Sequence, residues 1–229
     1  MRLPSCAHRA SLCLICRSWQ TEVLCADCRA AFAPPQPRCL HCALPLDQPG
    51  TDCPNCQRDP PPVSRALAAV DYRHPWDQLL LGLKFADQPE LAGPLADLLD
   101  AALRQAEPDW PDWVLPVPLA PARLRQRGYN QAWELARRLA ARHGLQGAPD
   151  LLWRVRETPH QLALTRAERA GNVRDAFACA PQARSLLAGR RVALVDDVLT
   201  TGATTAEAAR ALLRAGASEV QVWVVARAP

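Results

Sequence analysis

Lysine is almost missing from this chain of 229 residues. Lys84 is the only lysine among 27 basic residues, and the others are arginines. An arginine bias of this kind usually follows genome composition, so the arginines as a class carry little functional information. The net charge of +4 is mild and says little by itself about nucleic acid. The single lysine is therefore the basic residue that stands out.

Long apolar runs are missing as well. The apolar patch at residues 79–81 is far shorter than the ~20 residues that a membrane-spanning helix needs. The N-terminal sequence MRLPSCAHR has no apolar core of the kind found in signal peptides. We therefore expect a cytoplasmic protein with no membrane segment, whose reduced thiols are available for metal.

Several catalytic and binding signatures are also lacking. No Ser/His/Asp or Cys/His constellation for nucleophilic catalysis is evident in the sequence. No Gly-Lys-Ser/Thr ends a glycine-containing loop, which excludes a Walker A phosphate loop. The seven Trp, two Tyr and three Phe are not interleaved with arginine in a clear stacking platform. The sequence alone therefore does not establish binding of single-stranded nucleic acid.

Cysteine, by contrast, is abundant: eight of the ten cysteines form four Cys-x-x-Cys pairs. Each pair places two thiolates on one side of a tight turn, and two pairs complete a tetrahedral Zn²⁺ site. We predict two structural zinc ions. The short spacers favour pairing in chain order, although a crossed arrangement, first pair with third and second with fourth, also fits the spacing. The predicted ligands are Cys13, Cys16, Cys25, Cys28, Cys39, Cys42, Cys53 and Cys56.

A proline-rich segment that begins with Asp59 and three prolines marks a stiff boundary after the cysteines. We expect a double zinc ribbon over residues 1–58, a linker over 59–65 and a second domain over 66–229. In that second domain, predicted strands alternate with predicted helices, which favours an α/β fold with a mostly parallel sheet. The strands are expected at 66–72, 113–118, 151–155, 192–195 and 220–225, and the main helices at 75–85, 90–105, 131–142 and 205–216.

The most informative stretch runs from Val192 to Thr204. Four apolar residues predict a buried strand, and Asp196 and Asp197 stand where it ends. A Thr/Gly loop made of Thr200, Thr201, Gly202, Ala203 and Thr204 then leads into a helix. Helix N-terminal amides, threonine hydroxyls and close backbone approach at glycine together make a phosphate cradle. The acids are placed to hold the hydroxyls of an attached sugar, or Mg²⁺, so ribose 5-phosphate fits this arrangement.

Two further basic segments are candidates for anion contacts. Arg123, Arg125 and Arg127 precede Gly128 in a basic loop that is either simply exposed or a second anion site. The position of this loop after a strand and before a helix favours the anion site. Lys84, near the end of a predicted helix, is either a solvated cation or a phosphate contact. A capping box at Thr165 predicts a short helix in an arginine-rich stretch, either a solvated face or a lid over pyrophosphate. The arginines of that stretch are Arg154, Arg156, Arg166, Arg169 and Arg174.

The stretch from Val192 to Thr204 resembles the phosphoribosyl-pyrophosphate (PRPP) motif of the type I phosphoribosyltransferases. The whole chain resembles the ComF family, which has ComFC and GntX as relatives. The matching elements occur in one order along nearly the whole chain: the Cys-x-x-Cys pairs, Leu83-Lys84, Pro116-Val-Pro118, Arg123 to Gln131, Gln161 to Phe177, and the PRPP motif.

This resemblance implies a double zinc ribbon fused to a type I phosphoribosyltransferase fold, with a role in natural transformation. It implies that Asp196 and Asp197 hold the ribose and that residues 200–204 hold the 5-phosphate. Lys84, Arg123 and Arg127 would then contact pyrophosphate, with Mg²⁺ bound alongside PRPP. The implied partners are PRPP or a phosphorylated ribose, single-stranded DNA and a competence helicase.

Three functions remain open from the sequence. The first is a ComF-type protein that binds PRPP or a 5′-phosphorylated nucleic-acid end during DNA uptake. The second is a metabolic phosphoribosyltransferase that acts on a free nucleobase, against which the zinc module argues. The third is a non-catalytic zinc-ribbon adaptor for DNA or a helicase, against which the intact acid and Thr/Gly loop argues.

Overall fold

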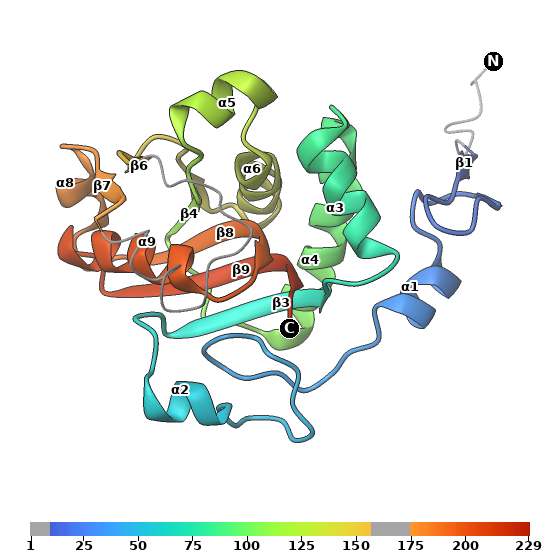
Figure 1. Cartoon of the computed structure of the whole chain (residues 1–229), viewed down its shortest axis with the longest axis horizontal. Helices are drawn as coiled ribbons and strands as arrows, with labels where there is room; N and C mark the ends of the chain where they lie inside the picture. The colour runs from blue at the N-terminus through green and yellow to red at the C-terminus, as the bar shows by residue number, and fades with distance from the viewer. Residues whose placement is uncertain (1–9, 157–174) are drawn as a thin grey trace, which may run out of the picture. The chain divides into compact units, whose positions relative to one another are not determined.

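A computed structural model describes residues 10–156 and 175–229 of the chain. The chain divides into two compact units, residues 1–35 and residues 36–229. In the first unit, β1 (Ser11–Leu12) pairs antiparallel with β2 (Trp19–Gln20), and α1 (Ala26–Phe32) follows (Figure 1). Its core contains the buried Cys13, Cys25 and Cys28, so little apolar packing supports this unit.

The second unit is built on a five-stranded sheet in the order β3-β9-β8-β4-β5. All four neighbouring pairs are parallel, as the alternation of predicted strands and helices indicates. The strands are β3 (Arg65–Asp71), β4 (Trp113–Pro116), β5 (Gln146–Gly147), β8 (Arg191–Leu199) and β9 (Glu219–Arg227). In the central strand β8, Val192 to Val195 are fully buried, which explains why this strand is a continuous apolar run.

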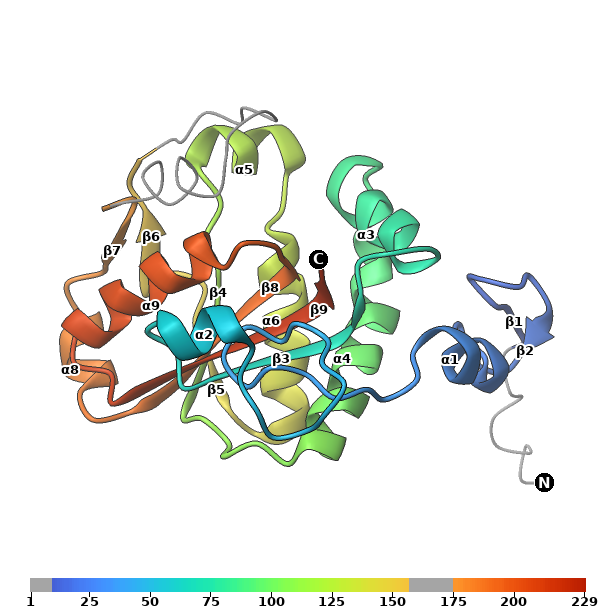
Figure 2. The ribbon, with the colours of Figure 1, turned by 60° about the horizontal axis from the view of Figure 1, so that its bottom comes forward.

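Helices cover both faces of this sheet. On one side α4 (Ala92–Ala106) and α6 (Gln131–His143) pack against the strands, and on the other lies α9 (Ala203–Arg214), as Figure 2 shows. The hairpin of β6 (Leu152–Arg154) and β7 (Phe177–Cys179) is antiparallel and packs against α9. The remaining elements are α2 (Pro54–Arg58), α3 (Trp76–Phe85), the 3₁₀ turn η1 (Pro89–Leu91), α5 (Pro121–Arg127) and α8 (Ala183–Leu187).

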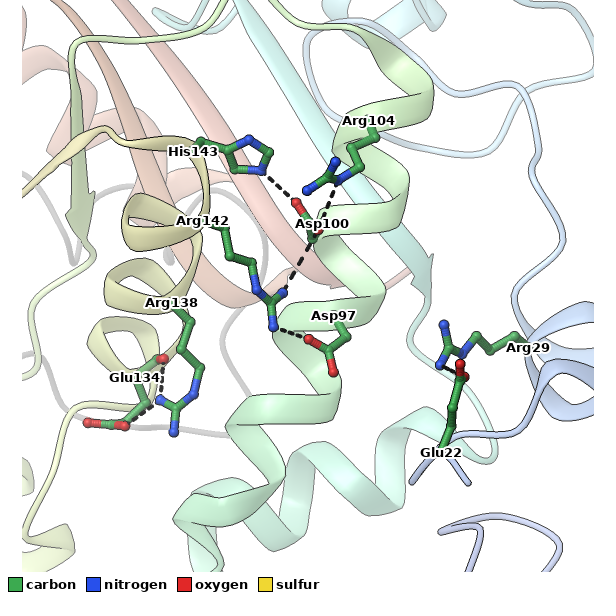
Figure 3. A network of polar contacts seen from close by, with 9 residues as sticks. All are labelled: Glu22, Arg29, Asp97, Asp100, Arg104, Glu134, Arg138, Arg142 and His143. Atoms are coloured by element: carbon green, nitrogen blue, oxygen red, sulfur yellow. Dashed lines mark hydrogen bonds and ion pairs between the residues drawn. The ribbon is translucent and has the colours of Figure 1, made fainter. Parts of the chain in front are cut away.

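An ion-pair network joins α4 to α6. Asp100 on α4 accepts a bond from Arg104 at 3.1 Å and contacts His143 Nε2 at 2.5 Å. Arg142 on α6 pairs with Asp97, one turn earlier on α4 (Figure 3). These contacts lie toward one end of the two helices and complement the apolar contacts between them.

The expected α/β architecture is confirmed, and its local differences have physical causes. The segment expected as a basic loop before Gly128 is the helix α5, because Pro121 is pre-organised for its first turn and Gly128 takes the left-handed conformation that ends it. β8 extends to Leu199, so the two acids belong to the strand itself. The helix expected from Thr165 lies outside the described residues.

The division between the units falls earlier than the expected linker at residues 59–65. Residues 36–58 belong to the unit that carries the large sheet. The amide of Ala66 on β3 donates to the carbonyl of Leu40 at 2.7 Å, and Arg38 pairs with Asp71 at 2.9 Å. These bonds tie the second cysteine segment to an edge strand. Within the described residues, no helix combines the length and apolarity needed to cross a membrane.

Candidate functional site

Strand β8 presents the two acids at the C-terminal edge of the sheet. The side chain of Asp197 is 3% exposed, and its Oδ2 lies 2.7 Å from Nζ of Lys84. The ammonium of Lys84 is the one polar partner of this buried oxygen within the part of the chain that the structure describes. Because α3 ends one residue after Lys84, the lysine reaches the strand end from a helix terminus. The sequence-predicted residues Lys84 and Asp197 are therefore in direct contact.

The charges in this site shift one another's protonation. Burial lowers the pKa of Lys84, but the charges of Asp197 and Asp196 outweigh it and hold that pKa above its usual value. Burial raises the pKa of Asp196 well above its usual range, and the neighbouring charge of Asp197 adds to this rise. Lys84 opposes that rise. The site thus concentrates negative charge that a bound cation or hydroxyl donors would stabilise.

Two arginines, Arg127 and Arg154, lie within electrostatic reach of the acid pair, and Arg123 lies within reach of both arginines. Burial lowers the pKa of Arg127 on α5, while the charges of Asp197 and Asp196 oppose that fall. Burial and the charge of Arg123 lower the pKa of Arg154 on β6, with Asp196 opposing. Both guanidinium groups lie over aromatic rings: Arg127 is 5.3 Å from the Phe85 centroid and Arg154 is 5.6 Å from that of Phe177. These stacking contacts orient the cations.

The Thr/Gly loop joins β8 directly to α9. Gly202 has φ +78°, in the left-handed region that glycine tolerates best, and it precedes the first residue of the helix. Thr205 Oγ1 donates to the Gly202 carbonyl at 3.0 Å, which fixes the turn. The amides of Thr200, Thr201, Gly202 and Thr204 donate to no other residue within the described ranges. Unpaired amides at a helix N-terminus are suited to bind an anion.

The structure thus brings Lys84, Asp196, Asp197, Arg123 and Arg127 into one electrostatic cluster, and the loop of residues 200–204 follows immediately. Arg154 belongs to this cluster too. In the sequence, only its place at the end of a predicted strand sets it apart from the four other arginines of the basic stretch. Three of those arginines, Arg166, Arg169 and Arg174, lie outside the described residues.

The eight predicted zinc ligands form two clusters, paired in chain order. Cys13, Cys16, Cys25 and Cys28 form one, and Cys39, Cys42, Cys53 and Cys56 the other; within each, the four sulfurs lie within 4.8 Å of one another. The crossed arrangement is therefore not the one adopted.

The spacing of these sulfurs suits zinc. A tetrahedral site with Zn–S bonds of about 2.3 Å has S···S edges of about 3.8 Å. The separations Cys16 Sγ···Cys25 Sγ and Cys42 Sγ···Cys53 Sγ are 3.8 and 3.7 Å. In the second cluster, the amide of Cys53 also donates to Cys39 Sγ at 3.3 Å, a bond that stabilises a thiolate.

The pKa values of the cysteine thiols also favour metal binding. Burial alone would raise the pKa of Cys13, but bonds from the amides of Cys25, Cys16 and Ile15 bring it to about 6. Burial and the neighbouring thiols raise the pKa of Cys28 to about 12. Four adjacent thiols cannot all ionise without a cation between them, so each cluster favours a bound metal ion.

Comparisons with known proteins agree with this geometry. Residues 127–229 match the family model of the phosphoribosyl transferase domain. The chain is 35% identical over 223 residues to the DNA utilization protein YhgH of Salmonella typhi, covering 94% of this chain and 96% of that one. It is 34% identical over 209 residues to competence protein F of Haemophilus influenzae, covering 90% of each.

A solved structure, the glutamine PRPP amidotransferase of B. subtilis, matches with a TM-score of 0.40 and 24% identity. That match covers 58% of this chain and 26% of the solved one. Because the similarity to competence protein F and YhgH runs through nearly the full length on both sides, the chain belongs to the ComF family of proteins with a phosphoribosyltransferase domain.

Proposed function

We propose that this protein binds PRPP with Mg²⁺ at the acid pair and the Thr/Gly loop, and that it acts on DNA taken up or used by the cell. The observation that carries the proposal is the buried ion pair between Lys84 and Asp197 on the strand that leads directly into the phosphate cradle. The names of the relatives, DNA utilization protein and competence protein F, support the part that concerns DNA.

Each group has a proposed role in binding. The amides and hydroxyls of residues 200–204 bind the 5-phosphate. Asp196 and Asp197 accept hydrogen bonds from the ribose hydroxyls, and the ion pair with Lys84 holds the Asp197 carboxylate in place. Asp196 is the carboxylate without a paired cation among the described residues, so it is the better candidate to face Mg²⁺, directly or through water. Bound Mg²⁺ would supply positive charge beside the pyrophosphate.

If the site is catalytic, the protein supplies positioning and electrostatics. The bond between ribose C1 and the pyrophosphate oxygen breaks, a nitrogen nucleophile forms a bond to C1 from the opposite face, and the electron pair leaves with pyrophosphate. Arg123 and Arg127 stabilise the charge on that leaving group, and Lys84 adds to the positive field. No covalent intermediate with the protein is required.

Binding of PRPP is tested by thermal shift and calorimetry with and without Mg²⁺. The wild type should melt at a higher temperature with PRPP, by an amount that rises with ligand concentration. Asp196→Asn combined with Asp197→Asn should abolish that shift, whereas the exposed Asp150→Asn, the same chemical change at another place, should leave it intact. An equal shift in the double variant would reject the assignment of these acids.

The DNA part of the proposal has its own test. Single-stranded oligonucleotides with and without a 5′-phosphate should bind at low salt and weaken steeply as salt rises, because arginine–phosphate contacts release counterions. A free nucleobase that gives turnover with PRPP, together with no affinity for DNA, would favour the metabolic enzyme. Affinity for DNA without any response to PRPP would favour the zinc-ribbon adaptor.

A further inference from the structure

We propose that Arg227 is a positioning residue that couples metal at the second cysteine cluster to the phosphate loop. This inference rests on the proposed function of that loop. It concerns only the unit formed by residues 36–229, in which the second cluster, β9 and the loop all lie.

Arg227 is the last residue of β9, and it is 8% exposed. Its Nε donates to the carbonyl of Cys42 at 2.6 Å, and its Nη1 donates to the carbonyl of Leu199 at 3.2 Å. Cys42 is a member of the second metal cluster, and Leu199 is the last residue of β8, directly before Thr200. One buried guanidinium therefore bridges a metal-ligand residue and the residue that starts the loop.

Packing also links the two segments, because Ala43, next to Cys42, is buried in the same core cluster as Leu199. A cavity of about 410 Å³ separates the cysteine segment from the start of α9, and its walls include Cys42, Cys56, Pro61, Thr201 and Ala203. Close-packed side chains transmit displacement, and a cavity interrupts that transmission. The two bonds from Arg227 join the carbonyls of Cys42 and Leu199, residues that both line this cavity, and they are the directed polar link between these segments, so we assign Arg227 the coupling.

Loss of metal would act through this bond. The second cluster is held by short elements such as the five-residue α2, so its backbone depends on the metal for order. If the Cys42 carbonyl moves, Arg227 loses a buried acceptor, and its remaining partner is the Leu199 carbonyl at the entrance to the loop. The bond from the Ala66 amide to the Leu40 carbonyl does not involve Arg227. We therefore expect the second cysteine segment to stay attached to β3 while its position relative to the loop of residues 200–204 changes.

Coupling between two binding sites is reciprocal. Metal at the second cluster should strengthen PRPP binding at the loop, and PRPP should in turn slow the loss of that metal to a chelator. The first cluster lies in the other compact unit. The two clusters are therefore expected to differ in their effect on the loop.

The first test compares equivalent ligand substitutions in the two clusters. Cys42→Ser and Cys53→Ser should weaken PRPP binding, measured by calorimetry, by about tenfold or more. Cys16→Ser, the matched substitution in the first cluster, should change it by less than about twofold. Equal effects from both clusters, or no effect from the second, would overturn the proposal.

The second test removes the bridge and keeps the metal. Arg227→Met should retain two zinc ions per chain and bind PRPP about tenfold more weakly, and Arg227→Lys should recover part of that loss. Arg65→Met is the control, because Arg65 also donates to a backbone carbonyl, that of Ala106, away from the loop. In the variant Arg227→Met, the further change Cys53→Ser should have little additional effect, since the path is already broken. Fully additive losses would contradict the coupling.

The third measurement needs no ligand. Amide hydrogen exchange at Ala206 and Ala228, whose amides donate to the carbonyls of Gly202 and Leu199, should become faster when zinc is removed from the wild type, and it should be fast with or without zinc in Arg227→Met or Arg227→Gln. If the wild type failed to bind PRPP, the proposed function would be rejected while this measurement still tested the coupling. If the rate of amide exchange in the wild type were the same with and without zinc, the inference would be overturned.

Discussion

Replacing Lys84 with methionine should destabilise the protein and expose the role of its ion pair. Methionine keeps the length and the apolar stem of the side chain and removes the ammonium. Oδ2 of Asp197 then has no polar partner among the described residues, in a side chain that is 3% exposed. An uncompensated buried carboxylate is costly, because it has lost water without gaining a counter-charge.

The size of the effect follows from the geometry. At 2.7 Å, two unit charges in an effective dielectric of about 20 attract by about 6 kcal/mol before desolvation is subtracted. Removal of one partner from a buried pair typically costs about 3–5 kcal/mol. Because the Lys84 side chain is still 22% exposed, we expect the lower end, about 3 kcal/mol. For a chain of this size, that corresponds to a fall in Tm of about 6–12 °C.

The assay is a double-mutant cycle in urea unfolding at neutral pH. Lys84→Met and Asp197→Asn are measured singly and together, and the double variant should recover about 2 kcal/mol relative to the sum of the single losses. Asn has nearly the shape of Asp and carries no charge, so the pair becomes neutral without a cavity. Strict additivity would refute the reasoning, because it would mean that the two charges do not interact in the folded protein.

The pH dependence adds a check of sign. Folding raises the pKa of Lys84, so its contribution to stability is complete below the unfolded value of about 10.4 and is lost as the pH rises through the folded value. The difference in stability between wild type and Lys84→Met should therefore shrink at strongly alkaline pH. A difference that grows there would contradict the assignment.

Three further predictions concern single sites. Metal analysis should give two zinc ions per chain, and Cys16→Ser should lower the count toward one; a wild-type count of one would refute the second site. Asp196→Asn should stabilise the ligand-free protein at pH 7 by about 0.5–2 kcal/mol in urea unfolding, because folding raises the pKa of Asp196; the gain should vanish as the pH falls toward 4, and a gain that persists there would contradict this cause. Gly202→Ala, at φ +78°, should cost about 1–2 kcal/mol and weaken the PRPP-induced shift, whereas Gly189→Ala, at φ +69°, should cost the same and leave the shift unchanged.

The parts of this structure that are local in sequence are predictable from it. The strand, acids, loop and helix from Val192 to Arg214 are contiguous, so their order alone predicts the strand–loop–helix arrangement for which we propose phosphate binding. Cys-x-x-Cys spacing likewise fixes each knuckle. The short spacers favour pairing of the knuckles in chain order, but only the three-dimensional structure distinguishes this from the crossed arrangement.

Long-range contacts are the parts that could not be predicted. Arg154 resembles every other arginine of a basic stretch until β6 places it beside Arg123 and Asp196. Arg227 reaches a carbonyl 185 positions away in the chain, and backbone carbonyls have no sequence signal. The bond between Ala66 and Leu40 could not be predicted for the same reason, since proline content marks a stiff segment and says nothing of the contacts across it.

The attachment of residues 36–58 to the large sheet has a practical consequence for dissecting the protein. A fragment that starts at Gln36 keeps the bonds from Gln36 and Arg38 to Asp71, in addition to the more distant ion pair with Arg73. A fragment that starts after the prolines would leave that carboxylate with the ion pair to Arg73 at 3.8 Å, and it would deprive the Arg227 guanidinium of its acceptor on Cys42. We therefore expect a fragment that starts at Gln36, and not one that starts after the proline-rich segment, to be soluble and suitable for crystallisation.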